Sequence, residues 1–186
     1  METDPFEQIA SGVVTSAEQA ACQGEMIPTL QEALVFTHEA NWRVNVELKS
    51  LPEPMTHFPV VARVLKMIER LGMKEEQLVI SSFNHDWLRE VQMLAPNLEV
   101  QALIGYYEAK PLDWGDLKFK TYNARGTLAD EDKIRAVTKK GVSVNLFTVN
   151  EEDEMQRFIK AGAAGIITDF PQRLNALLHR KEGAQD

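Results

Sequence analysis

The stretch RVNVELKSL, residues 43–51, combines reactive side chains with the spacing of a β-strand. Asn45, Glu47 and Lys49 alternate there with aliphatic residues. Residues two apart in a strand share a face of the sheet, so an amide, a carboxylate and an ammonium group would point the same way. That face either holds a ligand or is a solvated edge with a Glu47–Lys49 ion pair of little energetic value.

Further polar residues come late in apolar runs, where a parallel sheet would gather them at one end. They are Ser81, Ser82, Thr148, Asn150, Thr168 and Asp169. Ser81 and Ser82 have neither a neighbouring histidine nor the strand–turn pattern of an activated nucleophile. We therefore expect both hydroxyls to be hydrogen-bonded structural groups.

The four histidines are dispersed along the sequence, at positions 38, 57, 85 and 179. His85 stands in the triplet Asn84-His85-Asp86, where an Asn84 side chain capping a helix explains the cluster without a metal. Asn123 and Arg125 could reach the mouth of a pocket, but TYNARG (121–126) is more typical of a turn. No catalytic residue is predicted from these patterns.

Bulk composition excludes several function classes. The 186 residues suffice for one domain with a sizeable core, and a net charge of −8 argues against nucleic-acid binding. No apolar run approaches the length of a transmembrane segment, and METDPFEQIA lacks the features of a signal peptide. The single cysteine, Cys22, excludes an internal disulfide. A cytoplasmic location is the default expectation.

Apolar β-branched runs alternate with segments of helical period. Strands are expected at residues 44–48, 78–83, 99–104, 117–122, 142–149 and 165–170. Helices are expected at residues 29–40, 60–72, 86–95, 130–141, 151–162 and 171–180, the first with a capping box from Thr29 to Glu32. Residues 105–116 are expected to form a loop.

This βα order predicts an α/β fold with a parallel sheet, either doubly wound or a barrel. Polar residues at the strand ends favour a barrel, whose carboxyl-terminal face carries function. A full barrel has eight strands and typically about 250 residues, so this sequence is two strands short.

Several blocks together resemble the glycerophosphodiester phosphodiesterase family. They are IPTLQEAL, NVELKS, VISSFNHDWLREVQMLAPNLEV and VNLFTVNEEDEMQRFIKAGAAGIITDFPQRL, and the resemblance extends from about Ile27 to Leu178. It implies an incomplete TIM-type (β/α) barrel that lacks its first two βα units. The expected organisation is a loop-like segment at 1–26, the partial barrel at 27–180 and a polar tail at 181–186.

The resemblance also implies a function in lipid metabolism: metal-dependent hydrolysis of glycerophosphodiesters to glycerol 3-phosphate and an alcohol. In the family, three carboxylates hold Mg²⁺ or Ca²⁺ and two histidines act as acid and base. Glu47 is the metal ligand that carries over to this sequence. Lys49 would face the phosphate, and Phe83 and Phe147 would line the pocket, with phenylalanine at 147 where tryptophan is common.

The remaining family motifs are missing from the sequence. Nothing before Ile27 reads HRG, ENT, ELD or HD, and none of the four histidines occupies a family catalytic position. We therefore expect weak or absent cation binding and an inactive chain. The alternative is a non-catalytic barrel that binds a phosphorylated ligand, or that associates with a second copy or a complementing chain through its open sheet edges.

Overall fold

The structure is a computed structural model that describes residues 14–182. The chain divides into two units, Met1–Ala33 and Leu34–Asp186. In the first unit, helix α1 (Ser16–Ala21) corrects the loop predicted for residues 1–26. Thr15 and Glu18 cap this helix reciprocally, because the Thr15 hydroxyl accepts from the Glu18 N–H at 3.2 Å and Glu18 accepts from the Thr15 N–H at 2.8 Å. The rest of that predicted loop, residues 1–13, lies outside the described residues.

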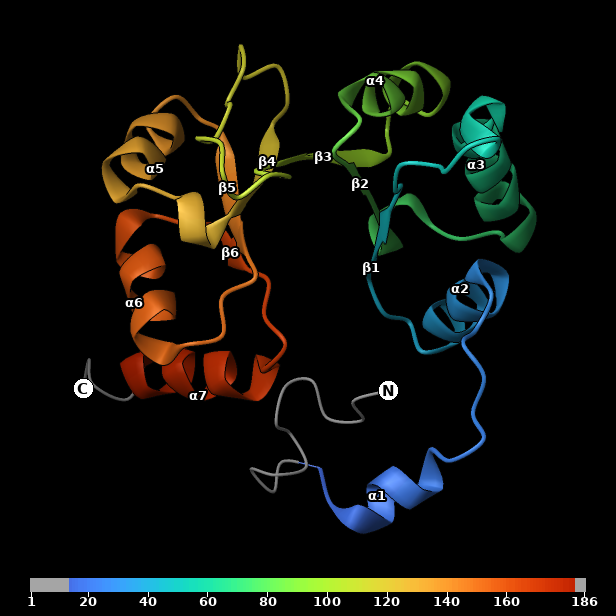
Figure 1. Ribbon diagram of the computed structural model, residues 1–186, viewed down its shortest axis with the longest axis horizontal. Helices are drawn as coiled ribbons and strands as arrows, with labels where there is room; N and C mark the ends of the chain where they lie inside the picture. The colour runs from blue at the N-terminus through green and yellow to red at the C-terminus, as the bar shows by residue number, and fades with distance from the viewer. Residues whose placement is uncertain (1–13, 183–186) are drawn as a thin grey trace. The chain divides into compact units, whose positions relative to one another are not determined.

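The second unit is built on one six-stranded parallel sheet with strand order β1-β2-β3-β4-β5-β6. The strands are β1 (Val44–Glu47), β2 (Leu78–Ser82), β3 (Glu99–Ile104), β4 (Thr121–Arg125), β5 (Ser143–Phe147) and β6 (Gly165–Ile166). The sheet curls, and helices α3 to α6 lie along its outer side (Figure 1). Consecutive parallel strands with helices along the outer side are the arrangement of a TIM-type barrel, so that prediction is confirmed.

The helices follow the predicted order closely. They are α2 (Leu30–Glu39), α3 (Val60–Leu71), α4 (His85–Leu94), α5 (Glu131–Thr138), α6 (Glu152–Ala161) and α7 (Pro171–Glu182), with short 3₁₀ turns at η1 (Met55–His57), η2 (Glu75–Gln77) and η3 (Gly126–Leu128). The predicted capping box of α2 is present, with Glu32 accepting from the Thr29 N–H at 2.8 Å. Helix α7 includes residues 181 and 182, which were predicted to be tail, while residues 183–186 are outside the described part.

Alternation along each strand separates a core face from a concave face. The core-facing residues of the strands pack against the helices; they are Val46, Leu78, Ile80, Val100, Ala102, Ile104, Tyr122, Ala124, Val144 and Leu146. The residues between them lie on the opposite face, and several of them line a common cavity on the concave side of the curl. In the same range, β1 pairs only with β2 and β6 only with β5, so both edges of the sheet are open.

The fourth strand lies further along the chain than predicted. LKFKTY (117–122) was read as a strand because its apolar residues alternate, but β4 begins at Thr121. Leu117 has a positive φ of 53°, which a strand does not accommodate. The alternation instead reflects a loop whose Phe119 is buried against the Tyr122 ring at 6.0 Å between centroids. The predicted loop at 105–116 contains neither helix nor strand.

No helix among the described residues is both long and apolar enough to span a bilayer.

Candidate functional site

A cavity of about 600 Å³ lies on the concave side, where the strands end. It is lined by Asn45, Glu47, Lys49, Ser81, Phe83, Leu103, Tyr106, Arg125, Phe147, Thr148 and Ile167. All six strands, or residues that closely follow them, contribute to it, and β6 does so through Ile167. In barrels the carboxyl-terminal face is the functional one, which makes this cavity the candidate site.

The alternating polar residues of β1 and the residues after it lie along the wall of this cavity. Glu47 and Lys49 both line the cavity, and the Lys49 Nζ atom is 2.8 Å from the Glu47 carboxylate. The Lys49 side chain is 76% exposed and that of Glu47 30% exposed, so solvent weakens their attraction. The two residues therefore form an ion pair and also line the cavity, and the lysine ammonium remains accessible to an anionic ligand.

The two serines of β2 behave differently from each other. Ser82 donates to the Leu48 carbonyl at 2.7 Å and accepts from the Asn84 N–H at 3.0 Å, as expected of a structural hydroxyl. Ser81 is fully buried and pairs in register with Glu47, yet its hydroxyl has no hydrogen-bond partner among the described residues. The expectation of a satisfied hydroxyl is therefore wrong for Ser81, which presents an unused donor and acceptor at the cavity wall.

The sheet also carries side-chain amides on neighbouring positions of β4 and β5. Asn123 is fully buried, and its carbonyl oxygen accepts from the Asn145 amide at 2.8 Å. The amide nitrogen of Asn123 has no partner within residues 14–182. Sequence reasoning missed this layer because it read residues 121–126 as a turn.

Aromatic side chains form one wall of the cavity. Phe83 makes edge-to-face contacts with Phe147 at 6.0 Å and with Tyr106 at 5.0 Å between ring centroids. The structure thus brings together Phe83 and Phe147, which were predicted to line a pocket, and adds Tyr106 from the loop after β3. Aromatic walls of this kind, with a few polar groups beside them, are typical of small-molecule sites.

Arg125 is a second cation at the cavity, and the turn predicted around it is wrong. It ends β4, its Nε donates to the Gly105 carbonyl at 2.6 Å, and its Nη1 donates to Glu108 at 2.9 Å. Its guanidinium carbon lies 5.5 Å from the Phe147 ring centroid. The alternation Thr121, Asn123, Arg125 was the sequence signal that could have placed it on a strand.

None of the four histidines lines this cavity. His38 is on α2 and contacts Gln77 at 3.2 Å, His57 ends η1, and His179 is on α7. His85 begins α4, where Asn84 caps the helix as predicted, and its Nε2 donates to the Leu103 carbonyl at 3.0 Å.

The side chains described do not fit a Mg²⁺ or Ca²⁺ site by themselves. These ions prefer six or more oxygen ligands. Of the residues that the structure describes, Glu47 is the single carboxylate that lines the cavity, and it already contacts Lys49. In residues 14–182, no three histidine, cysteine, aspartate or glutamate side chains gather as metal ligands would.

Comparison with known proteins places these observations in a family. Residues 3–173 match the model of the glycerophosphoryl diester phosphodiesterase family. This match begins earlier than the resemblance at Ile27, so it includes most of the segment that was expected to precede the barrel. A glycerophosphodiester phosphodiesterase of Caldanaerobacter subterraneus is 32% identical over 160 residues, covering 84% of this chain and 64% of that protein. One of Bacillus altitudinis is 29% identical, covering 90% and 69%.

Solved structures agree with the fold. A glycerophosphodiester phosphodiesterase from Parabacteroides distasonis superimposes with a TM-score of 0.70 at 26% identity, covering 85% of this chain and 67% of that one. An Oleispira antarctica phosphodiesterase in complex with sn-glycerol-3-phosphate gives a TM-score of 0.72 at 20% identity, covering 87% and 65%. The chain thus spans about two thirds of the length of its relatives. The chain belongs to the glycerophosphoryl diester phosphodiesterase family.

Proposed function

We propose that the concave cavity binds the glycerol phosphate part of a glycerophosphodiester. Lys49 and Arg125 supply positive charge for the phosphate, as lysine and arginine do at many phosphate sites. Phe83 and Phe147 pack against the carbon skeleton of the glycerol. The observation that carries this proposal is one cavity, at the carboxyl ends of the strands, that combines two cations with an aromatic wall.

We further propose that the complete reaction needs groups beyond those described at this cavity. Hydrolysis of a phosphodiester requires proton transfer to the leaving oxygen, and general acid–base catalysis typically contributes about 10²- to 10⁴-fold in rate. Histidine is the usual group for that task near neutral pH, and none lines the cavity. Glu47 offers one of the oxygens a divalent cation needs, so cation binding by this chain alone is weak and no step is assigned to it.

The runner-up function is a non-catalytic module that binds a phosphorylated ligand, and the position of the histidines favours it. It includes association through the open edges of β1 and β6, because unpaired strand edges invite pairing with a second copy or a complementing chain. Light scattering tests that part directly. A monomer at all concentrations would contradict edge pairing.

Two measurements on the 186-residue chain separate these possibilities. Calorimetry with glycerol 3-phosphate measures binding, and an enzyme-coupled assay with glycerophosphocholine and Mg²⁺ or Ca²⁺ measures hydrolysis. We expect binding of glycerol 3-phosphate and turnover no faster than the protein-free control. Robust turnover would contradict the inactivity of the chain, and failure to bind glycerol 3-phosphate would contradict the assignment of the cavity.

A further inference from the structure

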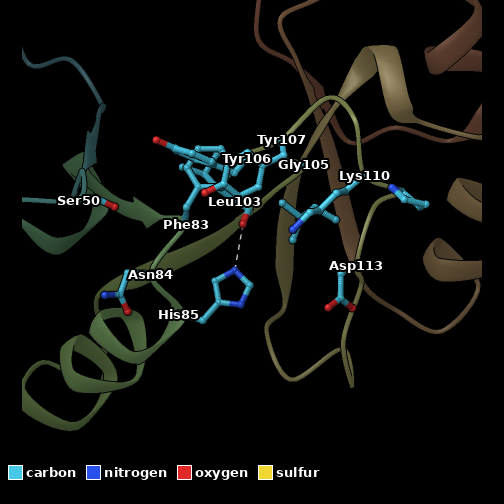
Figure 2. A pocket seen from close by; sticks show the side chains of 12 residues that line it. Ser50, Phe83, Asn84, His85, Leu103, Gly105, Tyr106, Tyr107, Lys110 and Asp113 are labelled. Atoms are coloured by element: carbon cyan, nitrogen blue, oxygen red, sulfur yellow. Dashed lines mark hydrogen bonds between the residues drawn. The ribbon is translucent and has the colours of Figure 1, made fainter.

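A second cavity, of about 630 Å³, adjoins the first at the same end of the sheet. It lies between the start of α4 and the loop that follows β3, and Figure 2 shows its side chains. Phe83, Leu103 and Tyr106 line both cavities. A ligand whose phosphate sits in the first cavity can therefore extend across this shared wall into the second.

One side of the second cavity is aromatic and positively charged. Tyr106 and Tyr107 contact each other edge to face at 4.8 Å and remain 56% and 60% exposed. The Lys110 Nζ atom lies 5.0 Å from the Tyr107 ring centroid. No carboxylate of the described residues forms a salt bridge with Lys110, so its charge is not neutralised locally.

The other side presents hydrogen-bonding groups, and Figure 2 shows His85 and Asp113 across from the tyrosines. The His85 Nε2 carries a proton because its partner is the Leu103 carbonyl, which leaves Nδ1 as an acceptor in the neutral ring. The Asp113 carboxylate accepts from the Gly115 N–H at 2.9 Å and keeps further acceptor capacity. Ser50 adds a hydroxyl that can donate and accept.

We infer that the second cavity binds the alcohol group of the diester and favours a neutral, polyhydroxylated one, such as inositol or a sugar. Hydroxyl groups can donate to His85 and Asp113 and accept from Lys110, and the exposed Tyr106 offers an apolar surface for a ring. A quaternary ammonium group is disfavoured beside Tyr107, because Lys110 already lies over that ring and repels a second cation. This inference rests on the proposed function, because it assumes that the phosphate binds in the first cavity.

Calorimetry with four ligands tests the inference: glycerol 3-phosphate, glycerophosphoinositol, glycerophosphocholine and glycerophosphoserine. We expect glycerophosphoinositol to bind about tenfold more tightly than the other three, the equivalent of one or two additional hydrogen bonds. Equal affinities for all four would overturn this inference and leave the proposed function standing. Tightest binding of glycerophosphoserine would overturn it in favour of a zwitterionic group. Failure of glycerol 3-phosphate and every diester to bind would overturn both.

A pair of lysine variants tests whether the second cavity is responsible for a preference for the inositol diester. Lys110→Met removes the charge over Tyr107, so we expect the affinity ratio of the inositol to the choline diester to fall at least about threefold. Lys118→Met is the matched control, since Lys118 belongs to the same loop but pairs with Asp116 at 2.7 Å and lines neither cavity. An unchanged ratio in Lys110→Met, or an equal change in the control, would overturn the inference.

Discussion

Replacing Arg125 with methionine tests the cation that the sequence pattern assigned to a turn. Methionine keeps an unbranched side chain of similar reach and removes the guanidinium. The variant loses the hydrogen bond from Nε to the Gly105 carbonyl, the ion pair with Glu108 and the contact with the Phe147 ring. These contacts hold the start of the loop after β3, which carries Tyr106.

The expected cost follows from each contact. A hydrogen bond from a charged group contributes about 1.5–3 kcal/mol. The Glu108 side chain is 72% exposed, so its ion pair contributes at most about 1 kcal/mol. The cation–π contact adds about 0.5–1 kcal/mol. Because neighbouring contacts are not additive, we expect a loss of about 2–3 kcal/mol, or roughly 5–10 °C in Tm for a chain of this size.

Urea denaturation followed by circular dichroism measures this loss, with an unchanged m-value as the sign that folding is otherwise the same. Arg135→Met is the matched control. Within the described residues the Arg135 side chain forms ion pairs only with Glu131 and Asp132 on the surface of α5, so this substitution should cost less than about 1 kcal/mol. An equal loss in both variants would refute the contact between Arg125 and Gly105. Affinity of Arg125→Met for glycerol 3-phosphate should fall about tenfold or more. Unchanged affinity would reduce Arg125 to a structural role.

Three further predictions concern other residues of the barrel unit. Lys49→Met should lower the affinity for glycerol 3-phosphate about tenfold. Because the Lys49 side chain is exposed, the free energy of unfolding should change by less than about 1 kcal/mol. Calorimetry and thermal melting measure these two effects, and unaltered affinity would count against a phosphate contact. Ser81→Ala should leave the free energy of unfolding equal or raise it by up to about 1–3 kcal/mol, because the buried hydroxyl has no hydrogen-bond partner in the described part of the chain; a clear loss in urea denaturation would mean that it has one. Burial raises the pKa of the Tyr122 hydroxyl above its ordinary value. The unfolded chain therefore ionises first, and stability should fall as the pH rises above about 10; Tyr122→Phe should show a smaller fall in unfolding experiments across that range, and identical pH profiles would argue against it.

The parallel sheet could be predicted from sequence because its strands alternate or are continuously apolar over short runs. VNVE, LVISS and SVNLF place aliphatic residues at every second position, and the structure buries these, Val44 only partly, in the core between sheet and helices. Glycine at the end of α3 and of α6 takes a left-handed conformation, which only the absence of a side chain makes easy. These local signals do not depend on distant parts of the chain.

The errors around β4 arose because contacts between residues far apart in the sequence determined the structure, against the local sequence pattern. Leu117 and Phe119 mimic a strand because a loop packs them against the core. Asn123 and Arg125 looked like turn residues because polar side chains are uncommon in a buried strand. In this barrel the inner face accepts them, and no periodicity could show that Arg125 would meet Gly105, twenty residues away.

A crystal structure of the chain with glycerol 3-phosphate tests the central claim most directly. The account predicts that the phosphate lies within hydrogen-bond distance of Lys49 and Arg125, with the glycerol carbons against Phe83 and Phe147. A phosphate bound elsewhere on the chain, with the concave cavity holding only water, would contradict it.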